Sequence, residues 1–103
     1  MFVMQPCKVF HAPRNNINTV ANFPDPNFRS AVEEFIGVSH DAPFTAAQAV
    51  AKTGTLDCSS RNISSTTGIS FFTNISVLNC ESNQLTQLNL SGNEALRALI
   101  CST

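Results

Sequence analysis

Four thiols, two imidazoles and one isolated carboxylate are the groups of this 103-residue chain whose type could support covalent or metal chemistry. They are Cys7, Cys58, Cys80, Cys101, His11, His40 and Asp41. A thiolate beside a histidine is a nucleophile, and grouped thiols and imidazoles bind zinc. However, the sequence contains no Cys-x-x-Cys pair, no glycine-rich phosphate loop and no nucleophile elbow. We therefore predict no catalytic residue, no metal site and no cofactor.

Three of the cysteines end short triplets that recur along the second half of the chain. The triplets are Leu56-Asp57-Cys58, Leu78-Asn79-Cys80 and Leu99-Ile100-Cys101, at spacings of 22 and 21 residues. Apolar and polar residues alternate as in a half-buried strand, and a fixed long spacing is typical of a repeat architecture. We interpret the leucines and cysteines as inward ladders, with the thiols free and buried as small hydrophobic groups. Side chains stacked in successive strands point the same way, which is poor geometry for a disulfide.

The sequence also matches the leucine-rich-repeat template L-x-x-L-x-L-x-x-N-x-L. Its five defining places are occupied by Ile75, Leu78, Cys80, Asn83 and Leu85. Ten residues later the same pattern returns as Leu85, Leu88, Leu90 and Asn93. Each turn of about 21 residues is therefore expected to hold two short strands. The first coil is an exception, because GISFFTN is expected to form a short helical or irregular connection that carries Ile69 and Phe72 inward. Asn83 and Asn93 are interpreted as structural amides that turn inward and bond the backbone.

Two helices are predicted ahead of the repeats. In NFPDPNFRSAVEEFIG, Asp25 is placed as N-cap, Pro26 at the first helical position and Gly37 just past the end. The inward stripe is Phe28, Val32, Phe35 and Ile36. Arg29, Glu33 and Glu34 are predicted to face the other way. In FTAAQAVAKTG, Thr45 and Gln48 form a capping box, and Gly54 is placed to end the second helix.

The lead-in FPDPNFRSAVEEF followed by these repeats resembles bacterial leucine-rich-repeat proteins with nested 21-residue repeats. The resemblance implies an α/β-type leucine-rich-repeat solenoid with short parallel strands and a small helical N-terminal cap. The expected division is a leader of uncertain order at residues 1–20, the cap at 21–54 and repeats at 55–103, truncated at the C-terminal end. Relatives often carry an acidic calcium loop between the cap helices. The corresponding GVSHDAPFT has Asp41 alone, so we expect no calcium there.

Residues that alternate with the inward ladders would tile one outward face. They are Thr55, Asp57, Ser59, Val77, Asn79, Glu81, Ala98, Ile100 and Ser102. Repeat solenoids bind partners through such surfaces, and the resemblance implies proteins or glycans as ligands. The candidate contact residues are Asp57, Ser59, Asn79, Glu81 and Ile100. The alternative is a purely structural cap fragment of a longer repeat protein, with a solvated face and no ligand of its own.

Composition limits the classes of partner that the chain is expected to bind. With a net charge of −1 and 13% charged residues, the chain has no basic stripe for nucleic acid. It has no apolar segment of transmembrane length, and MFVMQPCKVF lacks the apolar run of a secretory signal. The resemblance nevertheless implies a bacterial surface or extracellular location. Further repeats of a longer chain, or self-association at the open C-terminal end, are also expected as partners. The sequons at Asn62, Asn74 and Asn89 are interpreted as chance matches in a chain rich in Asn and Ser.

Overall fold

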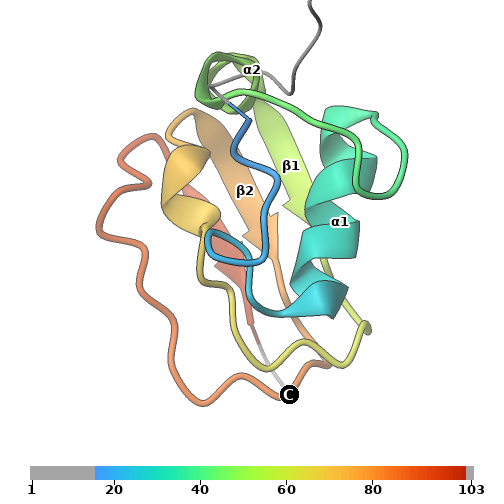
Figure 1. Ribbon diagram of the computed structural model, residues 1–103. Helices are drawn as coiled ribbons and strands as arrows, with labels where there is room; N and C mark the ends of the chain where they lie inside the picture. The colour runs from blue at the N-terminus through green and yellow to red at the C-terminus, as the bar shows by residue number, and fades with distance from the viewer. Residues whose placement is uncertain (1–15, 102–103) are drawn as a thin grey trace, which may run out of the picture.

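The computed structural model describes residues 16–101, so the expectations for Cys7, His11 and Ser102 lie outside the described residues. In chain order the elements are α1 (Pro26–Ile36), α2 (Ala46–Ala51), β1 (Gly54–Asp57), the 3₁₀ helix η1 (Ile69–Phe71), β2 (Ile75–Asn79) and β3 (Ala98–Ile100). The strands form a parallel sheet in the order β1-β2-β3, and α1 packs against β1 at the start of the sheet (Figure 1).

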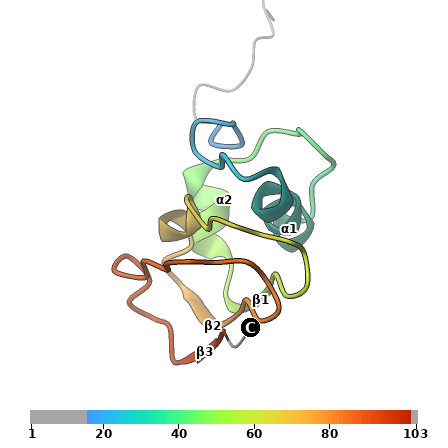
Figure 2. The ribbon, with the colours of Figure 1, turned by 90° about the horizontal axis from the view of Figure 1, so that it is seen from below.

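The strand register confirms the repeat predicted from the triplets. Leu56 pairs with Leu78, and Leu78 pairs with Leu99, so equivalent residues of successive triplets lie side by side. After β1 and after β2 the chain runs round a wide loop and returns to start the next strand, as Figure 2 shows from below. The chain is therefore a small leucine-rich-repeat solenoid with short parallel strands.

The expected helical connection in the first coil is confirmed by η1, with Ile69 and Phe72 buried, but the second strand expected in the next turn is absent from the described residues. Leu85, Leu88 and Leu90 do pack against the core, but their backbone joins no sheet. The preceding turn explains this. It carries η1 where an extended run would be needed, so the second turn has no parallel neighbour to pair with.

One apolar core joins the cap to the first coil. Phe23 lies at its centre, with ring centroids 5.9 Å from those of Phe44 and Phe71 and 6.2 Å from that of Phe28. Gly68 meets the edge of this cluster with a φ of 106°, and a Cβ there would collide with the Phe23 ring and the Asn22 carbonyl. Only glycine satisfies both the positive φ and the close approach.

Both predicted helix starts are confirmed. Asp25 Oδ1 accepts the N–H groups of Asn27 and Phe28, at 2.9 and 3.2 Å, as an N-cap should. Its Oδ2 accepts the N–H groups of Ser64 and Ser65, at 2.7 and 3.0 Å, so one carboxylate both caps α1 and holds the first coil. Burial raises the pKa of Asp25, but these four hydrogen bonds outweigh it and leave the pKa below its ordinary value.

The predicted helix ends are confirmed in one case and wrong in the other. Gly37 ends α1 in the left-handed conformation, with a φ of 93°. The second helix starts with the predicted capping box but ends at Ala51, with Lys52 as its C-cap. Gly54 opens β1 instead of closing that helix.

The prediction that Glu33 faces solvent is wrong. Glu33 is only 3% exposed, and its carboxylate accepts hydrogen bonds from Asn18 Nδ2 at 3.0 Å and from the Asp41 N–H at 2.9 Å. His40 Nδ1 lies 3.1 Å from its other oxygen. Burial raises the pKa of Glu33, yet the hydrogen bonds from Asn18, Asp41 and His40 prevail and leave the pKa below its ordinary value.

Residues 16–20, which were predicted to belong to the leader, pack with the cap through the same network. Ile17 and Asn18 are buried. The Ile17 N–H donates to the Phe44 carbonyl at 2.8 Å, and Asn18 Oδ1 accepts from Arg29 Nε at 2.7 Å. The cap is thus closed by a segment that precedes both of its helices.

Candidate interaction face

The outward side chains of the sheet form two registered rows across the three strands. Thr55, Val77 and Ala98 make the first row; Asp57, Asn79 and Ile100 make the second. Ser59 and Glu81 follow the ends of β1 and β2, where the Ser60 N–H donates to the Glu81 carbonyl at 3.0 Å. We call these eight residues the strand face. The structure brings all five candidate contact residues together on it.

Two of the polar side chains on the strand face are held by the same local hydrogen-bond pattern. Asp57 Oδ1 accepts the N–H of Ser59 at 3.1 Å and its hydroxyl at 2.7 Å. Asn79 Oδ1 accepts the Glu81 N–H at 3.2 Å. The two bonds from Ser59 are the main reason that the pKa of Asp57 lies below its ordinary value. Asp57 therefore presents a fixed negative charge, while the amide nitrogen of Asn79 remains available to a partner.

The inward ladder of leucine and cysteine side chains beneath this face is buried at β1 and exposed at β3. Leu56, Cys58, Leu78 and Cys80 are buried. The predicted burial of the ladder is wrong for its last two members: Leu99 is 41% exposed and Cys101 is exposed, because no element among residues 16–101 covers the outer side of β3. Cys58, Cys80 and Cys101 are all free.

The buried thiols are poor candidates for chemistry. Burial, with the neighbouring Cys80 thiol, raises the pKa of Cys58 to about 12. Burial also raises the pKa of Cys80. A nucleophile or metal ligand must be the thiolate, which these surroundings disfavour. The closed part of the ladder therefore serves packing.

Asn83 is the polar centre of the coil. Its Oδ1 accepts the N–H groups of Arg61 and Ile63, at 2.9 and 3.0 Å. Its Nδ2 donates to the carbonyls of Cys58 and Cys80, at 2.8 and 3.0 Å, and more weakly to that of Glu81 at 3.4 Å. One buried amide therefore joins the turn of the first coil to the turn of the second.

Asn93 occupies the equivalent place ten residues later but is less completely bonded. Its Nδ2 donates to the carbonyls of Ile69 and Phe72, at 3.0 and 2.9 Å. Its Oδ1 is buried and has no hydrogen-bond partner among the described residues. Asn83 is thus a donor and an acceptor to the backbone, whereas Asn93 is a donor only.

One cluster with metal-binding chemistry was missed by sequence reasoning. Ligand atoms of Glu33, His40 and Asp41 all lie within 4.8 Å of one another. Arg29 Nη2 lies 2.8 Å from Asp41 Oδ1, and Arg29 Nε lies 3.7 Å from Glu33 Oε2, so a guanidinium already supplies the balancing positive charge. The arrangement is that of a structural ion-pair network. The missing signal was the burial of Glu33, which depends on contacts made by residues distant in the sequence.

No helix in residues 16–101 is long and apolar enough to cross a membrane. No family model and no curated protein matches the sequence.

Three solved structures of Listeria monocytogenes proteins are similar to this chain. The functional domain of InlJ, which includes a cysteine ladder, matches with a TM-score of 0.72 and 28% identity over 90% of this chain. Internalin C2 matches with a TM-score of 0.75 and 24% identity over 87% of this chain. The internalin InlF matches with a TM-score of 0.70 and 24% identity over 80%.

The chain spans 21%, 40% and 24% of those three chains, respectively. The similarity covers both the helical cap and the parallel repeat strands, which are the two parts predicted from the sequence. Together with the register of the triplets, it shows that the chain has the leucine-rich-repeat fold of these bacterial proteins.

Proposed function

We propose that the chain is a non-catalytic recognition module whose strand face binds a protein partner, outside or on the surface of a bacterial cell. The internalin-like repeat fold suggests a protein-interaction module. The observation that carries the proposal is the registered row Asp57, Asn79 and Ile100, which sets a charge, an amide and an apolar side chain side by side on adjacent strands.

This row matches the composition expected of a protein contact. Ile100 is 41% exposed and offers apolar area to a partner. Asp57 carries a negative charge in the same row, on the other side of Asn79 from Ile100, and the Glu81 carboxylate lies just beyond β2. A partner that places lysine or arginine around an apolar side chain would complement this arrangement, because matched charges steer association and fix the orientation.

The test compares matched variants of the full 103-residue chain. A protein partner is first captured from extracellular and cell-surface protein fractions and purified. Its affinity for each variant is then measured by calorimetry. The double variant Asn79→Ala/Glu81→Ala should bind it at least about tenfold more weakly, since several contacts are removed at once. Gln84→Ala, which removes an exposed amide away from the strand face, should bind as the unchanged chain does. Equal affinity of the double variant and the control would refute the proposal.

A structural role as the N-terminal cap of a longer repeat array is the second candidate. It is favoured by the open side of β3, where Leu99 and Ile100 are each 41% exposed and could be covered by a further coil. Under this alternative the same double variant binds any protein as tightly as the unchanged chain does. Joining further repeats after β3 would then raise the stability of the cap without creating a ligand site.

A further inference from the structure

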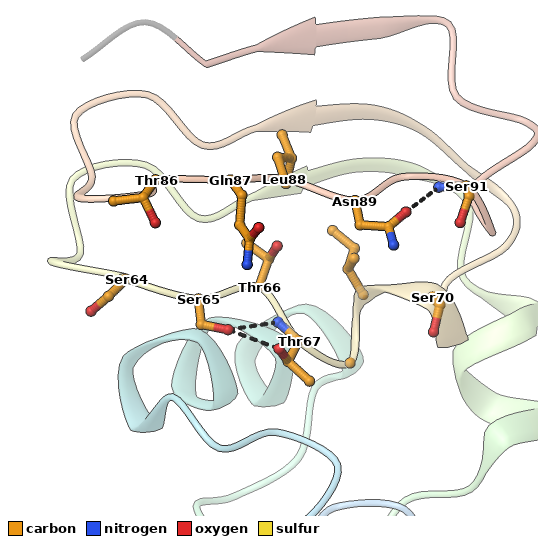
Figure 3. Close-up of a pocket in the computed structure, with 12 residues that line it drawn as sticks. Ser64, Ser65, Thr66, Thr67, Ser70, Thr86, Gln87, Leu88, Asn89 and Ser91 are labelled. Atoms are coloured by element: carbon orange, nitrogen blue, oxygen red, sulfur yellow. Dashed lines mark hydrogen bonds between the residues drawn. The ribbon is translucent and has the colours of Figure 1, made fainter.

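A groove of about 500 Å³ lies on the side of the coils away from the strand face. One wall is formed by residues 64–70 of the first coil and the other by residues 86–91 of the second, as Figure 3 shows. We call these segments the return stretches. Nine of the twelve lining residues carry a hydroxyl or a side-chain amide, and none is charged. The groove therefore offers many hydrogen-bonding groups without an electrostatic field of either sign.

Several polar groups in the groove are held in place and still have hydrogen-bonding capacity. Asn89 Oδ1 accepts the Ser91 N–H at 3.0 Å, which fixes the amide while its Nδ2 stays available. On the facing wall the Ser65 and Thr67 hydroxyls lie 2.8 Å apart, and Ser65 Oγ accepts the Thr67 N–H at 3.2 Å. Ordered side chains lose less entropy when a ligand binds.

Gln87 contributes the largest free polar group. In Figure 3 its side chain reaches from its own wall toward the wall that carries Thr66. The Gln87 side chain lines the groove and is exposed. An amide in this position can donate to one ligand hydroxyl and accept from another.

The wall formed by residues 64–70 is anchored to the cap. The Ser64 and Ser65 N–H groups are bonded to the Asp25 carboxylate, and Gly68 is pressed against the Phe23 ring. The first return stretch is thus held by α1 and by the aromatic cluster. This rigidity favours a site that is formed before a ligand arrives.

The lining selects a class of ligand. Phosphates and carboxylates are bound through Arg, Lys or helix N-termini, and cations through carboxylates, and the lining side chains include none of the charged groups. Facing rows of hydroxyls and amides instead match a chain of neutral hydroxyl groups. We propose that the groove binds a neutral oligosaccharide, separately from any partner of the strand face.

The experiment is a nuclear magnetic resonance titration of the full chain with cellohexaose, chitohexaose and maltohexaose. At least one of them should shift the backbone signals of residues 64–70 and 86–91 and the side-chain amide signals of Gln87 and Asn89, in a saturable way. The Asn79 signals on the strand face should stay in place. A negatively charged hexagalacturonate should not bind, because the lining has no cationic partner for it.

Matched glutamine variants locate the site. Gln87→Ala should raise the Kd of the bound hexasaccharide at least about fivefold, the loss of one or two hydrogen bonds. Gln84→Ala, an exposed glutamine outside the groove, should leave the Kd unchanged. The proposal is overturned if no neutral hexasaccharide shifts the groove signals, if hexagalacturonate binds as well as they do, or if the two variants bind alike.

Discussion

Replacing Asn83 by alanine should destabilise the chain more than any other single asparagine replacement in the repeats. The side chain accepts two backbone N–H groups and donates to three backbone carbonyls, all at the joint between the first and second coils. Alanine can neither donate nor accept, so these buried backbone groups lose their partners together.

The expected magnitude follows from the two orphaned N–H groups. Each buried donor left without an acceptor costs about 1–3 kcal/mol. The Ile63 N–H is buried and should carry the full cost, whereas the Arg61 N–H is partly exposed and should carry less. The free energy of unfolding should therefore fall by about 2–5 kcal/mol, a large part of the roughly 5–15 kcal/mol typical of a small domain. The Tm should drop by about 10 °C or more.

Asn93→Ala is the matched control, because Asn93 is also buried and occupies the same place in the template. It loses only donations to the carbonyls of Ile69 and Phe72, and the Ile69 carbonyl keeps the Phe72 N–H at 3.0 Å. The replacement also removes a buried oxygen that has no partner among the described residues. Its cost should be about 1–2 kcal/mol, from two neutral hydrogen bonds partly offset by that oxygen.

Urea unfolding followed by circular dichroism, with the m-value checked for each variant, measures both costs. Asn83→Ala should exceed Asn93→Ala by at least about 1 kcal/mol, since only the first replacement orphans backbone donors. Equal costs, or a larger cost for Asn93→Ala, would refute the claim that accepting backbone N–H groups is what makes the asparagine structural.

Three further predictions concern acid stability, backbone strain and thiol reactivity. Because the pKa of Glu33 is lowered in the folded chain, the stability that its carboxylate contributes is complete above the ordinary pKa of 4.5 and is lost as the pH falls through the lower folded pKa. Glu33→Gln should therefore flatten the dependence of the free energy of unfolding on pH in that range, measured by urea melts at a series of pH values. Gly68→Ala should lower the Tm by several degrees, through both the positive φ and the collision with the neighbouring ring, and an unchanged Tm would contradict the packing described here. Under native conditions a thiol reagent should label exposed Cys101 at least about tenfold faster than buried Cys58 or Cys80, with mass spectrometry reading each site, and equal rates would show that the ladder opens.

Part of this structure could be predicted from the sequence because it depends on chemistry within a few residues. Asp25, Pro26 and Gly37 set the bounds of α1 because N-capping, the fixed φ of proline and the positive φ of glycine act within a few residues. The strand register was equally readable, because the spacing of the triplets alone decides which leucines lie side by side.

Other features required contacts between distant residues. Glu33 looked like a solvent-facing residue on α1, and only the packing of Asn18 and of the loop carrying His40 and Asp41 buried it. The predicted second strand is missing for a related reason. A strand needs a neighbouring strand, and the preceding turn forms η1, the helical connection expected there, so the segment around Leu88 has no strand to pair with.

The sequence by itself therefore determined the repeat, the cap helices and which residues face outward from the sheet, because periodicity and capping are local properties. Tertiary structure alone decided how far each ladder residue is covered, so that Cys80 is buried while Cys101 is exposed. It also brought together residues 64–70 and 86–91, which are separated by β2 in the chain, to form a neutral groove. The physical reason is that burial and concavity depend on the spacing between coils, and no single stretch of residues specifies that spacing.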